Sequence, residues 1–184
     1  MLDDTLLIFT SDHGECLGEH GLIQKWSMYD AVTRVPTIVW SSANRFEAGR
    51  TVDGQCQWFD LGPTILELAG LAVPADFEAR SLLPALEGSG SWEPRPYVFC
   101  EQAGDVAMGG VEFITGVRSE RWKLVHFKGS AEGQLFDLAD DPGEVRNRWN
   151  DPACEEVRRE LLDAMREWLI ESNLRTRDRE AATR

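Results

Sequence analysis

The sequence predicts an α/β protein in which part of a sheet domain is followed by a small antiparallel sheet with a C-terminal helix. Two short apolar runs, near residues 5–10 and 35–40, have the length and composition of strands. Short strand-like segments separated by turns follow, and the chain ends in a helical repeat of apolar residues. We therefore expect two regions, residues 1–90 and residues 91–184.

The first apolar run, Thr5–Thr10, is too short for a helix and is rich in strand formers. Such an uninterrupted run favours a strand that is buried on both faces, as in a parallel sheet. The second run, Val35–Trp40, has Pro36 at its start, where a missing N–H disturbs a sheet least. Parallel neighbours need crossover connections, so we expect the neighbours of Thr5–Thr10 in another segment and the chain to enter its fold in the middle.

The segment Asp60–Gly70 predicts a helix. Asp60 fits the N-cap position, and Gly70 fits the residue just beyond the helix, where a left-handed conformation is common. From about residue 75 to residue 96 the sequence is typical of a loop, and its most flexible part is residues 88–91. We place the boundary between the two regions there.

The second region alternates strand-like segments with turns. The four expected strands are Tyr97–Cys100, Phe113–Arg118, Trp122–Phe127 and Leu135–Leu138. Residues 119–121 link two of them closely enough for a hairpin. A helix then begins with Asp151 as N-cap and Pro152 at the first helical position. Its apolar face comprises Val157, Leu161, Met165, Trp168 and Leu169. The polar tail 173–184 is expected to be frayed or docked on a partner.

The charge balance restricts the partners. The chain has 19 Lys and Arg against 32 Asp and Glu, a net charge of −13, which repels nucleic acid and anionic lipid. No stretch approaches the roughly 18 apolar residues of a membrane helix, so no membrane association is expected. An anionic substrate would need a local cation to overcome this field. The four scattered cysteines and the lack of a signal-like segment leave cytoplasmic and periplasmic locations open.

The most informative chemistry follows the first expected strand, where Asp12, His13 and Gly14 stand in succession. Ligands of open α/β sheets bind beyond the carboxyl ends of the strands. A bend at Gly14 would let the carboxylate and the imidazole converge on one divalent cation. From the residues alone, the alternative that Asp12 caps a turn and His13 lies on the surface is equally good.

Several motifs in the first region decide between these alternatives. The ordered set is Ser11–Glu15 (S-D-H-G-E), Leu17–Gly21 (L-G-E-H-G), Lys25 and Arg34–Pro36 (R-V-P). Further matches are Asp60–Gly70, Ser81–Leu86, Arg118–Leu124, Leu135–Leu138, Asp141–Glu144 and Asn147. Together they resemble the sulfatase family of the alkaline phosphatase superfamily, from about residue 4 to residue 170.

The resemblance implies an alkaline-phosphatase-like sheet domain, of which residues 1–90 would be the C-terminal part. It implies the C-terminal portion of a metal-dependent sulfuric ester hydrolase. Asp12 and His13 match the late pair of metal ligands, and Lys25 matches a lysine with catalytic and substrate-binding roles at the sulfate oxygens. His20 matches a residue that contacts the substrate or only braces its loop. Glu15 either supports the metal site or braces the turn.

The same resemblance bears on the metal. Many members have asparagine in place of His13, and the histidine form resembles the choline sulfatase, iduronate sulfatase and phosphonate monoester hydrolase branches. We expect Ca²⁺ as the bound metal. Mn²⁺ and Zn²⁺ are alternatives, because an imidazole accepts softer ions than an amide oxygen does. The expected partners are a small anionic ester and the remainder of the catalytic domain. A homo-oligomer is left open.

The family nucleophile, a formylglycine made within C-x-P-S-R, has no match at any of the four cysteines. The early pair of metal-binding aspartates and an upstream lysine and histidine also have no counterpart. We expect all of them to precede residue 1, and we expect this chain alone to be inactive. The alternatives are a phosphonate monoester or phosphodiester hydrolase with the same site, and a non-catalytic fragment.

Overall fold

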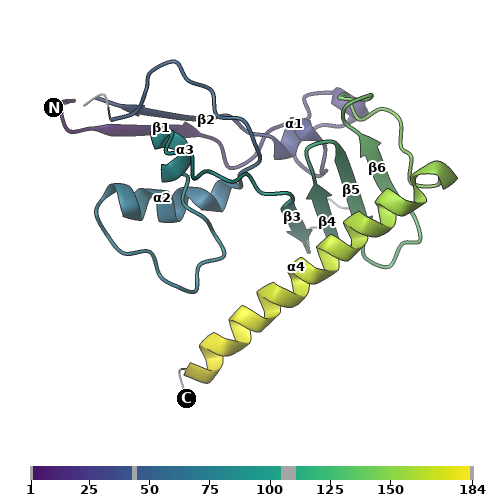
Figure 1. The fold of residues 1–184 in the computed structure, drawn as a ribbon. Coiled ribbons are helices and arrows are strands. Elements are labelled where there is room, and N and C mark those ends of the chain that lie inside the picture. Colours follow the sequence, from purple (N-terminus) through teal and green to yellow (C-terminus); the bar gives the residue numbers. More distant parts are fainter. Residues whose placement is uncertain (1, 43–44, 105–110, 183–184) are drawn as a thin grey trace. The chain divides into compact units, whose positions relative to one another are not determined.

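The computed structural model describes residues 2–42, 45–104 and 111–182, with side chains described as far as residue 175. The chain divides into two compact units, Met1–Arg95 and Pro96–Arg184, each with its own sheet and helices (Figure 1). No helix within the described ranges is long and apolar enough to cross a lipid bilayer. The predicted α/β fold class is confirmed, with a two-stranded sheet, a four-stranded antiparallel sheet and a C-terminal helix.

The sheet of the first unit consists of β1 (Leu6–Thr10) and β2 (Thr37–Ser41), which pair antiparallel. The two strands were predicted, but the expectation of a parallel strand buried on both faces is wrong for the described structure. In β1 half-buried and exposed residues alternate, and Leu7 and Phe9 are 49% and 58% exposed. An apolar run shows that both faces suit burial, but it does not encode the direction of the neighbouring strand.

The described part of the first unit also has five short helical segments: the 3₁₀ turns η1 (Glu19–Gly21) and η2 (Trp58–Asp60), and the helices α1 (Asp30–Thr33), α2 (Leu61–Leu68) and α3 (Leu83–Glu87). The predicted helix is confirmed as α2, and Gly70 adopts the expected left-handed conformation just beyond it. Helix α3 corrects the expectation of a continuous loop over residues 75–96. Its short L-P-A-L-E sequence spans little more than one turn, too few residues for a helical period to be visible.

Asp60 occupies the predicted N-cap position of α2, but its side chain makes no capping hydrogen bond to that helix. It ends the 3₁₀ turn η2 (Trp58–Asp60), and its carboxylate is fully buried and accepts hydrogen bonds from the backbone N–H groups of Gln57 and Arg80. The guanidinium of Arg95 forms an ion pair with it at 2.5 Å. Asp60 therefore ties the start of α2 to two later segments of the unit, which stabilises their arrangement.

The second unit is built on a four-stranded antiparallel sheet in the order β3-β4-β5-β6. Its strands are β3 (Val98–Ala103), β4 (Phe113–Arg118), β5 (Trp122–Phe127) and β6 (Gly133–Asp137). All four agree with the prediction within three residues at each end. The predicted hairpin between β4 and β5 is also confirmed, and Ser119 closes it by donating its N–H to the carbonyl of Trp122 at 2.8 Å.

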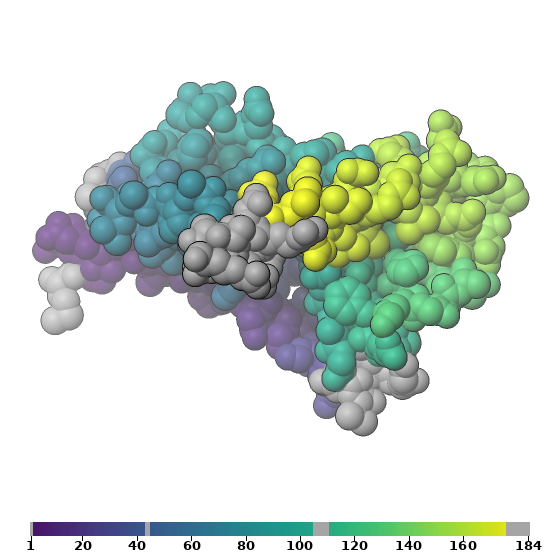
Figure 2. Space-filling view, turned by 90° about the horizontal axis from the view of Figure 1, so that it is seen from below, coloured from purple at the N-terminus to yellow at the C-terminus, as the bar shows by residue number. Residues whose placement is uncertain are grey.

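A short 3₁₀ turn, η4 (Pro152–Cys154), leads into the long helix α4 (Glu155–Ala182), which packs on one face of this sheet. Asp151 caps this start as predicted, because its carboxylate accepts from the N–H of Ala153 at 2.9 Å. Of the two expectations for the tail, fraying from residue 173 is not seen, since α4 continues to Ala182 (Figure 1), and docking on a partner stays a prediction. The polar sequence there carries no apolar face, yet it is rich in good helix formers. The space-filling view shows the part of α4 with described side chains, coloured yellow, at the surface (Figure 2).

The core of the second unit lies between the sheet and α4. Its buried members are Val117, Leu124, Leu135, Trp149, Cys154, Leu161 and Met165. The ring of Trp168 extends this core by stacking on Phe99, with 4.5 Å between centroids. The sheet and the helix thus bury one continuous apolar layer.

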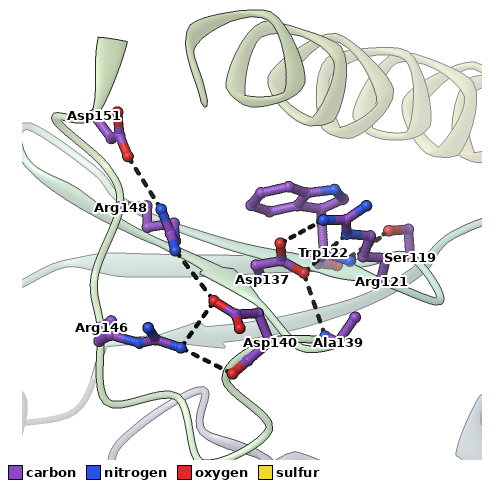
Figure 3. A network of polar contacts seen from close by, with 9 residues as sticks. All are labelled: Ser119, Arg121, Trp122, Asp137, Ala139, Asp140, Arg146, Arg148 and Asp151. Carbon is purple, nitrogen blue, oxygen red and sulfur yellow. Dashed lines mark hydrogen bonds and ion pairs between the residues drawn. The ribbon is translucent and has the colours of Figure 1, made fainter. Parts of the chain in front are cut away.

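Charged side chains fasten the loops of the second unit, and Figure 3 shows the network. Arg121 binds both carboxylate oxygens of Asp137, at 2.9 and 2.7 Å, and this hydrogen bonding holds the pKa of Asp137 below its usual range. Asp140 accepts from Arg146 and Arg148 at 2.9 and 3.3 Å. Arg121 and Asp137 both lie in segments that resemble the sulfatase family, and here they pair with each other to hold loops together.

Candidate functional site

The chain turns sharply after β1 because Gly14 lies against the backbone of α1. The N–H of Gly14 donates to the carbonyl of Val32 at 2.8 Å. A Cβ atom at residue 14 would lie 1.9 Å from the carbonyl oxygen of Ala31, so only glycine fits this close approach. The turn places Asp12 and His13 side by side at the carboxyl end of β1.

Asp12 and His13 converge. The Asp12 Oδ1 atom accepts the backbone N–H of His13 at 3.0 Å, and Oδ2 lies 3.6 Å from His13 Nε2. The pKa of Asp12 lies below its ordinary value, first because of this backbone hydrogen bond and also because of the nearby positive charge of Lys25. The carboxylate is thus ionised, and its side chain is 75% exposed.

The tautomer of His13 follows from its contacts. Nδ1 lies 2.8 Å from the carbonyl oxygen of Gly14, which can only accept, so Nδ1 carries the proton. Nε2 in turn faces the Lys25 ammonium, which can only donate a hydrogen bond, so Nε2 keeps its lone pair. Lys25 Nζ lies 3.1 Å from this atom and donates to it. Nε2 is the ring atom with a lone pair, and a cation bound there would replace the hydrogen bond from Lys25.

The three sequence-predicted residues Asp12, His13 and Lys25 thus lie together. The fourth, His20, lies outside this cluster: its ring stacks on Tyr29, with 3.7 Å between centroids and 5° between planes. Within the described part of the chain, His20 has no hydrogen bond or ion pair with the other three. Its φ of 54° is a left-handed conformation that a non-glycine residue rarely adopts, so the stack with Tyr29 braces a strained loop.

The cluster supplies only part of a coordination sphere. Among the residues that the structure describes, no group of three or more His, Cys, Asp or Glu side chains is arranged to hold a metal ion. One carboxylate and one imidazole nitrogen are fewer than the four ligands of zinc or the six to eight of calcium. The geometry of the pair is compatible with a shared cation, and the assignment of Asp12 and His13 as ligands stays a prediction.

The comparisons with known proteins agree on one family. Residues 18–171 match the family described as N-sulphoglucosamine sulphohydrolase, C-terminal. An N-acetylglucosamine-6-O-sulfatase of Bacteroides thetaiotaomicron is 32% identical over 90% of this chain and 30% of its own length. A multifunctional alkaline phosphatase superfamily protein of Trinickia caryophylli is 34% identical over 95% of this chain and 36% of its own length. The chain spans about a third of the length of these relatives.

Solved structures give the same result. A protein in complex with its substrate D-glucosamine-2-N,6-O-disulfate matches 94% of this chain and 35% of its own, with a TM-score of 0.83 and 30% identity. A phosphonate monoester hydrolase of Agrobacterium radiobacter matches 92% of this chain and 36% of its own, with a TM-score of 0.80 and 31% identity. This chain therefore belongs to the N-sulphoglucosamine sulphohydrolase C-terminal family, among the sulfatases of the alkaline phosphatase superfamily.

Proposed function

We propose that this chain is the C-terminal portion of a metal-dependent sulfuric ester hydrolase. Asp12 and His13 contribute two ligands to a divalent cation, and Lys25 binds the sulfate oxygens. The observation that supports this most strongly is the convergence of these three side chains at the end of β1, where His13 Nε2 lies 3.1 Å from Lys25 Nζ and 3.6 Å from Asp12 Oδ2.

Each side chain has a chemical task in this proposal. A bound cation would polarise the ester and lower the pKa of the nucleophile. The carboxylate of Asp12 and the Nε2 lone pair of His13 would hold that cation. The ammonium of Lys25 would stabilise charge that develops on the transferred group, which matters in a chain with a net charge of −13.

The remaining machinery requires residues outside this chain. We propose that the nucleophile and the other ligands belong to a preceding segment, because the matched relatives are about three times as long and the described residues offer no third ligand. Sequencing the DNA upstream of Met1 tests this point. An in-frame C-x-P-S-R supports it, and an upstream stop codon with no such segment contradicts it.

A phosphonate monoester or phosphodiester is the second candidate substrate. The likeness to the phosphonate monoester hydrolase, at 31% identity over 92% of the chain, favours it specifically. Both ester classes present anionic oxygens to the same cation and lysine, so these three residues do not separate them. Parallel assays of the complete gene product with p-nitrophenyl sulfate and with a p-nitrophenyl phosphonate monoester would rank the two substrates.

The role of Lys25 is tested by Lys25→Met in the complete gene product. We expect kcat/KM for the better ester to fall by about 10²- to 10³-fold, the usual loss of one charge-stabilising group. Lys128→Met is the matched control, because Lys128 is an exposed lysine paired with Glu112 in the other unit. Equal activities of the two variants would contradict the assignment of Lys25.

A further inference from the structure

The loop that bears Lys25 is closed at its base by two hydrogen bonds. The loop leaves the site after Gly14 and returns at Gln24. The N–H of Cys16 donates to the carbonyl of Gln24 at 3.1 Å, and the N–H of Gln24 donates to the carboxylate of Glu15. Lys25 follows directly, so this closure determines where its backbone lies.

The closure holds a strained residue. Gln24 has a φ of 67°, a left-handed conformation that side chains other than glycine rarely adopt and that persists only when its surroundings enforce it. Glu15 binds the N–H of this same residue. Trp26 adds a second restraint, because its indole N–H donates to the side-chain oxygen of Gln24 at 2.7 Å.

Glu15 stands two residues from His13, and Gln24 stands one residue from Lys25. The Glu15–Gln24 hydrogen bond therefore connects the segment that follows His13 to the segment that precedes Lys25. Between these two segments, Lys25 Nζ lies 3.1 Å from His13 Nε2. If the bond is lost, Gln24 can relax to a negative φ, which redirects the chain at Lys25. A shift of about 1 Å in a catalytic group reduces rates by as much as roughly 10²-fold.

We propose that Glu15 is a positioning residue for Lys25: it fixes the strained Gln24 backbone so that the Lys25 ammonium is presented to the anion site. This inference rests on the function proposed above. It assigns Glu15 to the loop rather than to the metal.

A double-mutant cycle in the complete gene product tests the coupling. We expect Glu15→Ala to lower kcat/KM by about 10- to 100-fold when Lys25 is present, and by less than about twofold when Lys25 is already methionine. Glu15→Gln keeps an oxygen that accepts from Gln24, so we expect it to stay within about threefold of the wild type. Glu47→Ala, which removes another exposed carboxylate of the same unit, should leave kcat/KM unchanged.

Hydrogen exchange followed by mass spectrometry supplies a readout that does not depend on activity. Peptides containing the Gln24 amide should exchange faster in Glu15→Ala, and at the wild-type rate in Glu15→Gln and Lys25→Met. Additive losses in the cycle, or no rescue by Glu15→Gln, would overturn the positioning role. If Lys25→Met itself had no effect, the proposed function would fail instead, so the two failures are distinguishable.

Discussion

The two units of this protein bury their apolar residues differently. In the second unit the sheet and α4 enclose a continuous core, in which Leu124 and Leu161 are at most 1% exposed. In the first unit the two-stranded sheet has an apolar face made of cross-strand pairs, Leu7 with Trp40 and Phe9 with Ile38. These four side chains are 45–58% exposed.

This difference coincides with the position of the proposed site, which lies in the first unit. The second unit has the layered architecture of a self-sufficient small domain. The first unit contains the Asp12, His13 and Lys25 cluster, but it leaves an apolar sheet face and two free strand edges without cover among the described residues. We propose that the remainder of the catalytic domain covers this face, because such a surface is otherwise an aggregation site.

The largest expected effect is in hydrogen exchange of the chain on its own. We expect the amides of β4, β5 and β6 to be protected far more strongly than those of β1, since protection follows the local free energy of opening. Limited proteolysis should likewise cut before about Pro96 first and leave a resistant C-terminal piece. Strong protection of β1 in a monomer would show that the first unit needs no partner.

Truncating a buried side chain of the second unit should reduce the stability of the protein far more than truncating an exposed side chain of the first unit. Leu161→Ala removes a side chain that is 1% exposed from the core of the second unit, so we expect the free energy of unfolding to fall by about 2–5 kcal/mol. Leu7→Ala truncates a side chain that is 49% exposed, and we expect a change within about 0.5 kcal/mol. Urea unfolding followed by circular dichroism measures both. Similar losses would mean that the Leu7 face is covered in this chain.

A smaller effect concerns pH and the Arg121–Asp137 pair. The pKa of Asp137 is lowered in the folded state, chiefly by the hydrogen bond from Arg121, so its contribution to stability is present above about pH 3.9 and is lost as pH falls through the lowered pKa. The difference in Tm between the wild type and Asp137→Asn should therefore shrink as pH falls from 6 towards 3. Asp163→Asn, which removes an exposed pair on α4, is the control. A difference that does not depend on pH would contradict this account.

The sequence predicted the second unit well because its strands are bounded by turns and its helix has a clear apolar period. Short-range patterns determine such elements. The direction of β1 could not be predicted, because the neighbour of a strand is a long-range property. The role of Asp60 was missed for the same reason, since its partners Arg80 and Arg95 lie 20 and 35 residues away.

The sequence likewise predicted part of the candidate site but not all of it. The adjacent Asp12 and His13 and the later Lys25 were found from motif and order, and the structure brings them together. The separation of His20 from them was not predictable, because its stack on Tyr29 depends on a left-handed backbone within a tight loop. Glu15 had two equally good interpretations until the hydrogen bond from Gln24 was seen.

The metal content of histidine variants of the complete gene product tests the central claim most directly. His13 belongs to the proposed site in the first unit, whereas His126 lies on β5 in the second. By inductively coupled plasma mass spectrometry, we expect His13→Ala to lose most of the bound divalent cation and His126→Ala to keep the wild-type content. His13→Asn should retain Ca²⁺ but not a softer ion, because its amide oxygen is a hard ligand. Full metal content in His13→Ala would contradict the proposal that this chain supplies part of the metal site.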